Sequence, residues 1–543
     1  MSLSLSLSDW TVFSIVLVLS LLYGLYMAYR KKASQNSSSF FLGGRNMTWP
    51  IVGASLFATN IGAEHLVGLS GDAYRYGLSA GHVEIMTIIP IGIAISLLFP
   101  YYMKNKVFTV PEFLELRFNK HARTFFSAFM LILSVMAKLA FTIFAGALVM
   151  KSMLGWNIMT TVICISLIVA VFTMIGGYTA VAYTGTIQVV IMILAGIIMV
   201  SVGLVKVGGW SELVANAGDK MHVVKPFDDP DYPFWGILAT AFYAGVFYWG
   251  IDQVNTQRVL AAHDLNTARK GATFAILLKL LPVFIFALPG VIAFALYQQG
   301  DASYLLQGEE SKETFVLLLN QLLPTGLKGL VLASLLAALI SSLIAVYNSI
   351  STLVVRDFIV KIKPGMTEKG QVMAGRYMIL VAAVLGICAA YMVYRNEEGL
   401  YKYLQAITAY LIIPVFPAIF FGIVSKRVTA KGAGVSVLIG ALISTIFVID
   451  QILGPETGKQ VFPFLHQTLT LNFGYRGLWA EIIITIVLFA VSAFTEKTAP
   501  EKLATTTLSF KKGGITKFEG LKDWRFHLVI LTIITVLIYL WLM

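Results

Sequence analysis

The sequence predicts an all-α polytopic membrane protein, and three observations lead to this class. Hydrophobic residues make up 58% of the 543 residues, charged residues make up only 13%, and the mean hydropathy is +0.81. Soluble proteins carry roughly 25% charged residues. Fourteen apolar stretches approach the roughly 20 residues that a membrane-spanning helix needs. This composition excludes a soluble enzyme, a disordered regulator and a nucleic-acid-binding protein.

The fourteen predicted spans follow one another along the whole chain. They lie near 8–29, 50–72, 81–104, 124–152, 156–177, 180–205, 233–257, 271–298, 328–355, 377–394, 400–425, 432–454, 477–495 and 526–543. The first is a span and not a cleaved signal peptide, because its basic residues, Arg30 to Lys32, follow the apolar run. Cys164 and Cys388 both lie inside apolar runs, which excludes a disulfide framework and a cysteine-rich metal site.

The distribution of Lys and Arg predicts the orientation of these spans. Of the 40 basic residues, 27 fall in one set of alternate loops and 11 in the other, and two, Lys138 and Lys279, lie inside spans. Cytoplasmic loops carry the excess of Lys and Arg. We therefore expect a multi-pass protein of the cell (inner) membrane with both termini extracellular or periplasmic. The net charge of +12 then reflects topology and not a polyanion-binding surface.

The number of spans also allows an internal repeat. Spans two to six and seven to eleven form two groups of five, and an odd number of spans gives the groups opposite orientations. Inverted repeats of this kind build transporters with a binding site at mid-membrane, between broken helices. We therefore expect an N-terminal extra helix with a cytoplasmic loop (1–49), a first repeat (50–206), a second repeat (207–425) and C-terminal peripheral helices (426–543).

Two predicted spans contain candidate helix breaks. The second span places Asn60 and Gly62 at mid-membrane depth, and the seventh contains Tyr248, Gly250 and Asp252. Unwound backbone is tolerated at this depth only where it is buried in protein or lines a cavity. The alternative is that the glycines only allow close packing of helices.

A small set of polar residues lies inside the predicted spans. It comprises Glu64, His65, Glu84, Lys138, Asp252 and Lys279, with Gln405 as a neutral addition. Each ionisable side chain at this depth costs about 2.5–3.5 kcal/mol on insertion scales. One interpretation is that Lys138 or Lys279 pairs with Asp252 or Glu84 and only stabilises the bundle, and the other is that the set lines a polar cavity.

The chemistry of this set favours a neutral polyol as its ligand. Acceptors, donors and aromatic rings occur together, and each sugar hydroxyl both donates and accepts. An anionic substrate would require an unpaired arginine, which no predicted span interior contains. A proton relay would require aligned carboxylates, which are also lacking.

Adjacent hydroxyls in the ninth span suggest a cation site. Ser341 and Ser342 follow Ala338, and a helix break in the second span would release the carbonyls of Ala58 and Ile61. Hard cations take oxygen ligands of this kind. The alternative is that both serines bond to the backbone of their own helix.

Several longer motifs resemble those of the solute:sodium symporter family, and within it those of its sodium/glucose and sodium/galactose branch. These motifs are Asn60 to Gly71, Pro111 to Phe118, Gly176 to Val181, Tyr248 to Gln253 with Gln257 and Arg258, and Ser341-Ser342 with Asn348-Ser349. Together they cover most of the chain. The resemblance implies a five-plus-five inverted-repeat core with flanking helices. It also implies sodium-coupled symport of a neutral hexose by alternating access, without enzymatic activity and with no obligate protein partner evident.

The resemblance also implies roles for individual residues. The sugar would contact Asn60, His65, Glu84, Tyr248, Lys279 and Gln405, with Thr87 and Trp249 nearby. The inner gate would be Tyr248, and the outer gate would be Leu69, Val83 and Tyr401. Sodium would bind the carbonyls of Ala58, Ile61 and Ala338 and the hydroxyls of Ser341 and Ser342.

Two departures from the family pattern bear on stoichiometry and selectivity. Gly185 stands where relatives commonly carry an Asp that is linked to a second sodium, so we expect one sodium per sugar. Gly245 stands where relatives carry a side chain that can bond to sugar, which leaves the preferred hexose open. Transport of myo-inositol or sialic acid remains an alternative. A channel, sensor, pump or membrane enzyme is disfavoured, because the sequence contains neither a nucleotide-binding loop nor a signalling domain.

Overall fold

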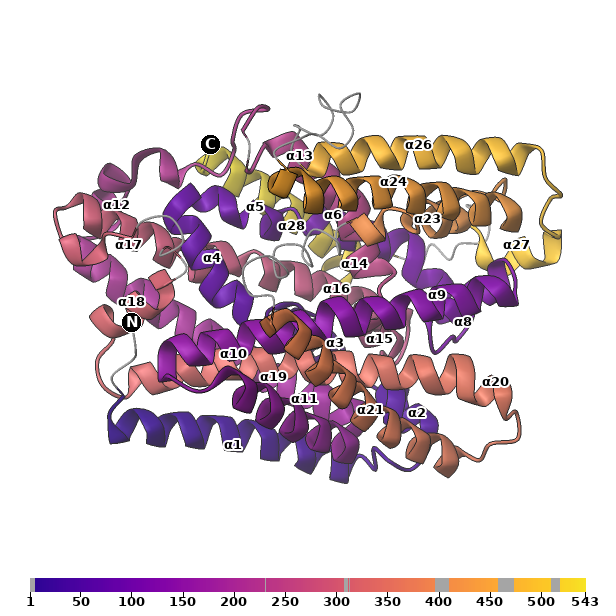
Figure 1. Cartoon of the computed structure of the whole chain (residues 1–543), viewed down its shortest axis with the longest axis horizontal. Helices are drawn as coiled ribbons and strands as arrows, with labels where there is room; N and C mark the ends of the chain where they lie inside the picture. The colour runs from indigo at the N-terminus through magenta and orange to yellow at the C-terminus, as the bar shows by residue number, and fades with distance from the viewer. Residues whose placement is uncertain are drawn as a thin grey trace.

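The computed structural model describes residues 5–229, 231–306, 311, 313–395, 410–457, 473–508 and 518–543, and it is built from helices. In these ranges, pairing between extended segments is limited to two isolated bridges, Met47 with Ala262 and Lys225 with Pro233. Most of the long helices lie roughly along the longest axis of the molecule (Figure 1). This arrangement confirms the all-α class.

The helices follow each other in chain order. In the first half they are α1 (Leu7–Arg30), α2 (Ser37–Leu42), α3 (Trp49–Asn60), α4 (Ala63–Tyr76), α5 (His82–Ile85), α6 (Ile88–Ile93), α7 (Phe99–Lys104), α8 (Val110–Arg117), α9 (Lys120–Ile132), α10 (Ala140–Leu154), α11 (Ile158–Val207) and α12 (Trp210–Ala217). In the second half they are α13 (Phe234–Thr240), α14 (Val246–Gly250), α15 (Gln253–Leu260), α16 (Leu265–Lys279), α17 (Leu288–Gln298), α18 (Thr314–Leu322), α19 (Leu327–Leu353), α20 (Val360–Ile362), α21 (Glu368–Arg395), α23 (Phe416–Val424), α24 (Ala430–Thr457), α26 (Phe473–Ala493), α27 (Pro500–Thr506) and α28 (Trp524–Trp541). In the described residues, five π-helical segments connect neighbouring helices, namely η3 (Ala94–Leu98), η4 (Leu133–Leu139), η6 (Ala241–Gly245), η7 (Val283–Ala287) and η10 (Val354–Ile359).

In the described part of the chain, ten helical segments are long and apolar enough to cross a membrane, and a bent pair, Phe234–Gly250 with Gln253–Leu260, makes an eleventh. The predicted number was fourteen. One difference lies in α11, whose 50 residues would form a straight rod of about 75 Å, more than twice the hydrocarbon thickness. Gly177, with φ 51° and ψ −157°, breaks this helix where two spans were predicted to meet.

Two further differences also concern broken or partly described spans. The predicted span 50–72 is divided into α3 and α4. Only the second part of the predicted span 400–425, from residue 410 onward, lies in the described residues. The count of fourteen and the division into two inverted repeats therefore stay predictions.

Both termini lie at the same end of the molecule. The N–H groups of Gly326 and Gly329 donate to Asp9 Oδ1 at 2.7 and 3.2 Å, and the N–H of Val223 donates to the Leu542 carbonyl at 2.9 Å. Thus the first helix is tied to the start of α19, and the last helix is tied to the segment that follows α12. Figure 1 shows both ends of the chain toward the left of the view.

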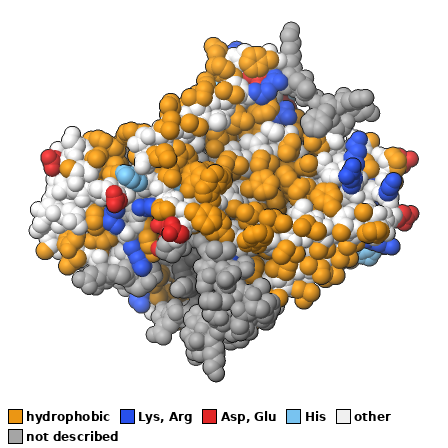
Figure 2. All heavy atoms as spheres, turned by 90° about the horizontal axis from the view of Figure 1, so that it is seen from above, with side chains coloured by type: hydrophobic (Ala, Val, Ile, Leu, Met, Phe, Trp, Pro, Cys, Tyr) orange, Lys and Arg blue, Asp and Glu red, His pale blue; other side chains and the backbone are white. Residues whose placement is uncertain are grey.

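The surface matches the expectation for a protein embedded in lipid. In Figure 2, hydrophobic side chains cover the centre of the visible face, whereas charged side chains gather mainly toward its left and right ends. The core lies around α19. In the most apolar part of its span 94% of the residues are buried, compared with 17% for α28. Thus α19 is central and α28 is peripheral.

A buried ion pair joins three segments at the end that carries most of the Lys and Arg. Asp357 in η10 accepts bonds from Arg123 Nε at 2.8 Å, from Thr109 Oγ1 at 2.9 Å and from Ser127 Oγ at 2.9 Å. Arg123 also pairs with Glu115 at 2.6 Å. Because Asp357 is 4% exposed, these partners replace water around its charge.

We predict that Asp357→Asn destabilises the protein. The substitution leaves the Arg123 guanidinium without its buried partner, and such a loss costs about 3–5 kcal/mol of unfolding free energy. The control is Lys361→Gln, which breaks an exposed pair with Glu115 and should cost less than about 1 kcal/mol. Thermal denaturation in detergent measures both, and equal midpoints for the two variants would contradict the prediction.

Candidate functional site

Both predicted helix breaks are present near the centre of the bundle. Helix α3 ends at Asn60, and α4 begins at residue 63, after Ile61 and Gly62 with extended backbone. Helix α14 ends at Gly250, and α15 begins after Asp252 at an angle of 54°. Backbone carbonyls next to such breaks lack their helical partners and become available for other contacts.

Four side chains from four helices meet beside these breaks. The Lys279 ammonium of α16 donates to Glu84 Oε2 of α5 and to Asn60 Oδ1 of α3. The Asn60 amide nitrogen donates to Tyr248 Oη of α14 at 3.1 Å. Glu84 and Lys279 are 7% and 1% exposed, so their opposite charges compensate each other away from solvent. We call these four residues the solute cluster.

His65 and Trp249 lie against this cluster. His65 Nε2 is 3.6 Å from Glu84 Oε1, and the N–H of Gly62 donates to His65 Nδ1 at 3.3 Å. The Lys279 ammonium is 5.9 Å from the centre of the Trp249 ring. The structure therefore brings together six of the eight residues predicted to contact the solute.

The remaining predicted residues are less closely connected or are not described. The Thr87 hydroxyl is buried and donates to the Val83 carbonyl of its own segment at 3.2 Å. Of the predicted outer gate, Val83 is 44% exposed and Leu69 is partly buried. Gln405 and Tyr401 lie outside the described residues.

The second intramembrane lysine has a different partner. Lys138, in the π-helical segment η4, donates to Asp252 Oδ2, and Asp252 Oδ1 accepts the N–H of Val254 at 3.0 Å. Asp252 therefore caps the first turn of α15 and is neutralised by Lys138. Of the pairings left open by the sequence, the structure contains Lys138 with Asp252 and Lys279 with Glu84.

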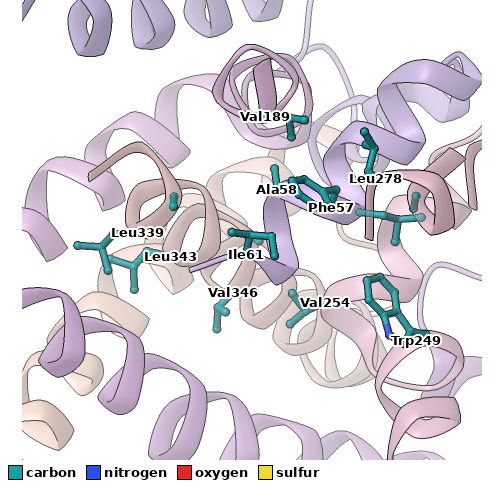
Figure 3. Packing of buried hydrophobic residues seen from close by; sticks show 14 of the residues in the cluster. Phe57, Ala58, Ile61, Val189, Trp249, Val254, Leu278, Leu339, Leu343 and Val346 are labelled. Carbon is teal, nitrogen blue, oxygen red and sulfur yellow. The ribbon is translucent and has the colours of Figure 1, made fainter. Parts of the chain in front are cut away.

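The five residues predicted to bind sodium lie together where α3 ends against α19. Ser341 Oγ is 3.0 Å from the carbonyl oxygen of Ala58 and 2.9 Å from that of Ala338. Ser342 Oγ is 3.5 Å from the carbonyl oxygen of Ile61. Figure 3 shows Ala58 and Ile61 packed among apolar side chains of α19 and α11. All five contributing atoms are uncharged oxygens, which we call the oxygen cluster.

Gly185 on α11 lies against the side chain of Ala58, whose carbonyl belongs to this cluster. A Cβ placed on Gly185 would lie 3.2 Å from the Cβ of Ala58. A longer side chain here would therefore extend beside the backbone that carries the oxygen cluster. The glycine keeps this space free of a carboxylate.

The sequence analysis missed Arg258, which follows the predicted seventh span and was assigned to a loop. In the structure it is fully buried, its Nε donates to Thr59 Oγ1 at 3.2 Å, and its guanidinium lies 5.0 Å from the Tyr178 ring centre. Its helix α15 also buries Gln253 and Gln257 completely. The apolar run after Arg258, Val259 to Ala262, is the sequence signal that could have placed it inside the protein.

Comparisons with known proteins agree with this architecture. Residues 40–440 match the model of the Sodium:solute symporter family. The sodium/myo-inositol cotransporter of Homo sapiens is 29% identical, covering 94% of this chain and 77% of that protein. The sodium/glucose cotransporter 1 of Ovis aries is 32% identical, covering 91% of this chain and 79% of the relative. The sodium/glucose cotransporter of Vibrio parahaemolyticus is 31% identical, with 90% and 91% covered.

A solved structure shares the fold. A Na+-coupled sialic acid symporter in a substrate-bound outward-open state superposes with a TM-score of 0.76 at 21% identity, covering 91% of this chain and 99% of the other. The family model covers well over half of the sequence, and the relatives extend across nearly all of it. The chain belongs to the sodium:solute symporter family, whose members are membrane transporters.

Proposed function

We propose that the protein is a sodium-coupled symporter that imports a neutral monosaccharide of the glucose or galactose type by alternating access. The observation that carries this proposal is the double role of α3. Asn60, at its end, belongs to the solute cluster, while the carbonyls of Ala58 and Ile61 belong to the oxygen cluster. Within four residues, one broken helix thus contributes groups to both proposed binding sites. Binding of a ligand at one site would therefore change the position of the groups that bind the other ligand.

The chemistry of the solute cluster supports an uncharged ligand. An amide, a carboxylate, an ammonium and a phenol supply both donors and acceptors, which suits hydroxyl groups. The charges of Glu84 and Lys279 already compensate each other, so a neutral ligand leaves no unbalanced charge in the core. On the strength of the family resemblance, we propose Gln405 as a further contact of the solute and Tyr401 as part of the outer gate.

A sodium/myo-inositol cotransporter among the relatives favours a second candidate, because a cyclic polyol presents the same hydroxyl chemistry. Sialic acid carries a carboxylate and is a different case. The lack of arginine in the predicted spans does not exclude it, because Arg258 is fully buried beside Thr59. A direct competition experiment decides between these solutes.

The coupling follows from shared stabilisation. Sodium in the oxygen cluster would hold α3 against α19 and thereby fix Asn60 for the solute, and by linkage the solute would raise sodium affinity by the same factor. With the termini outside, sodium enters the cell down its gradient and down the membrane potential, at about 2.3 kcal/mol per charge per 100 mV. Loss of sodium inside then loosens α3 from α19, Tyr248 moves aside and the solute leaves. Gly185 supports one sodium per solute.

We expect purified protein in proteoliposomes to accumulate glucose or galactose only under an inward sodium gradient, with saturation. Unlabelled glucose, galactose, mannose, myo-inositol and sialic acid are then tested as competitors of the labelled sugar. Strong competition by a hexose supports the proposal, and exclusive competition by myo-inositol selects the second candidate. Uptake that is independent of sodium, or that does not saturate, would contradict symport.

We predict that Ser342→Ala raises the sodium concentration for half-maximal uptake about tenfold or more, because a bond to a charged group contributes about 1.5–3 kcal/mol. The matched control is Ser334→Ala on the same helix, whose hydroxyl donates to its own backbone at Val331. That variant should keep the wild-type sodium dependence. Unchanged sodium activation in Ser342→Ala would remove the oxygen cluster from the mechanism.

We predict that Tyr248→Phe weakens the apparent affinity for the solute about fivefold, since it removes one hydrogen-bonding group worth about 1 kcal/mol. The sodium dependence, measured at saturating solute, should stay close to that of the wild type. Tyr243→Phe is the control, because Tyr243 is buried in the same span but packs against Gly477 of α26. An equal effect of both variants on solute affinity would argue against a specific role for the Tyr248 hydroxyl.

A further inference from the structure

A groove of about 670 Å³ lies between α16 and α28, and its lining includes no residue of the solute or oxygen cluster. The two helices lie side by side and run in the same direction, because Arg269 contacts Trp524 near their starts and Phe284, just beyond α16, stacks with Trp541 at the end of α28. Both helices follow loops of the Lys- and Arg-rich set, which the sequence predicts to be cytoplasmic. The groove therefore opens toward the predicted cytoplasmic leaflet.

The mouth of the groove is basic. Lys270, Lys522 and His527 line it, and the groove lining contains no acidic residue. Lys270 pairs with Glu519 at 3.0 Å, and this bond holds the pKa of Glu519 below its usual range. In the described ranges, neither the Lys522 ammonium nor the His527 ring has a hydrogen bond or an ion pair.

The other acidic group near the mouth is also occupied. Asp523, which caps α28, pairs with Arg525 at 2.7 Å. Both carboxylates at this position thus already have cationic partners. Among the described residues, the positive charge of Lys522 is thus left without a partner at the mouth.

The deeper part of the groove is apolar. The rings of Trp49 and Phe274 pack edge to face, 5.4 Å apart, on one wall, and Ile534 of α28 lies on the other. From His527 to Ile534 the helix advances seven residues, or about 10 Å along its axis. The groove therefore continues from a basic mouth into an apolar channel of roughly half the depth of one leaflet.

We propose that this groove binds one anionic phospholipid, with its phosphate at Lys270, Lys522 and His527 and an acyl chain along Trp49, Phe274 and Ile534. Basic pockets between membrane helices on the cytoplasmic side suit anionic headgroups. A zwitterionic lipid is a poorer occupant, because its own ammonium group would face the same lysines. The apolar channel alone would bind anionic and zwitterionic phospholipids with the same affinity. The positive charge at the mouth therefore makes the difference in favour of the anionic lipid.

The groove adjoins the helices of the solute cluster. Its walls include Trp49 of α3 and Phe274 of α16, and these helices pack so closely that a Cβ on Gly53 would lie 2.5 Å from the Gly271 carbonyl oxygen. A bound lipid would join α28 to this pair of helices. The lipid site stands independently of which solute is transported.

The test uses the purified full chain in detergent, titrated with phosphatidylglycerol or with phosphatidylcholine of the same acyl chains. Native mass spectrometry counts the bound lipids, and thermal unfolding reports the stabilisation. We expect tighter binding of phosphatidylglycerol. The double variant Lys522→Gln/His527→Gln should weaken it about fivefold or more, the factor for loss of one cationic charge near an anionic headgroup, and should leave phosphatidylcholine binding unchanged.

The matched control is Lys426→Gln/Lys431→Gln, two exposed lysines at the same end of the molecule. If both double variants lost phosphatidylglycerol binding equally, the loss would come from the overall surface charge and not from the groove, and the proposal would be overturned. Equal affinity of the wild type for the two lipids would also overturn it. Ile534→Trp fills the apolar channel without changing charge and should weaken both lipids, so unchanged binding in that variant would contradict the acyl-chain placement.

Discussion

The structure depends on how the interrupted backbone of α3 is satisfied in the middle of the membrane. Lipid offers no hydrogen bonds, so carbonyls released by a helix break need partners within the protein. At this break the hydroxyls of Ser341 and Ser342 lie against the carbonyls of Ala58 and Ile61. The centrally placed helix α19 therefore supplies what α3 lacks. In the proposed mechanism a cation uses the same oxygens, so one arrangement would both satisfy the interrupted backbone and bind the ion.

The second break is stabilised by charge. Asp252 uses one carboxylate oxygen to cap α15 and the other to accept from Lys138. Removing Lys138 would leave the Asp252 charge buried and unpaired, which is expensive in a medium of low dielectric constant. The same logic applies to Glu84 and Lys279, whose pair also holds Asn60. The two lysines predicted inside spans therefore have different roles: Lys138 stabilises a helix break, and Lys279 belongs to the solute cluster.

Sequence reasoning could predict the breaks and most of the candidate site but not how the charges are shared. Gly62 and Gly250 predicted the breaks, because glycine next to polar residues at mid-membrane depth is typical of unwound backbone that lines a cavity or is buried in protein. Which lysine meets which carboxylate depends on the three-dimensional packing of α5, η4 and α16, which hydropathy does not encode. Arg258 was missed for a related reason: a charged residue beyond an apolar stretch is normally exposed, and its burial depends on Thr59 and Tyr178, distant in sequence.

Arg258 also bears on the number of cations that the proposed mechanism couples. Its guanidinium is fully buried, and no carboxylate pairs with it in the described part of the chain. It donates to Thr59, the residue next to Ala58 of the oxygen cluster, so a fixed positive charge already lies close to the end of α3. A second cation beside Ala58 would add to this positive charge, and Gly185, on which a Cβ would lie 3.2 Å from the Cβ of Ala58, supplies no carboxylate to offset it. These charges support the proposed stoichiometry of one sodium per transported solute.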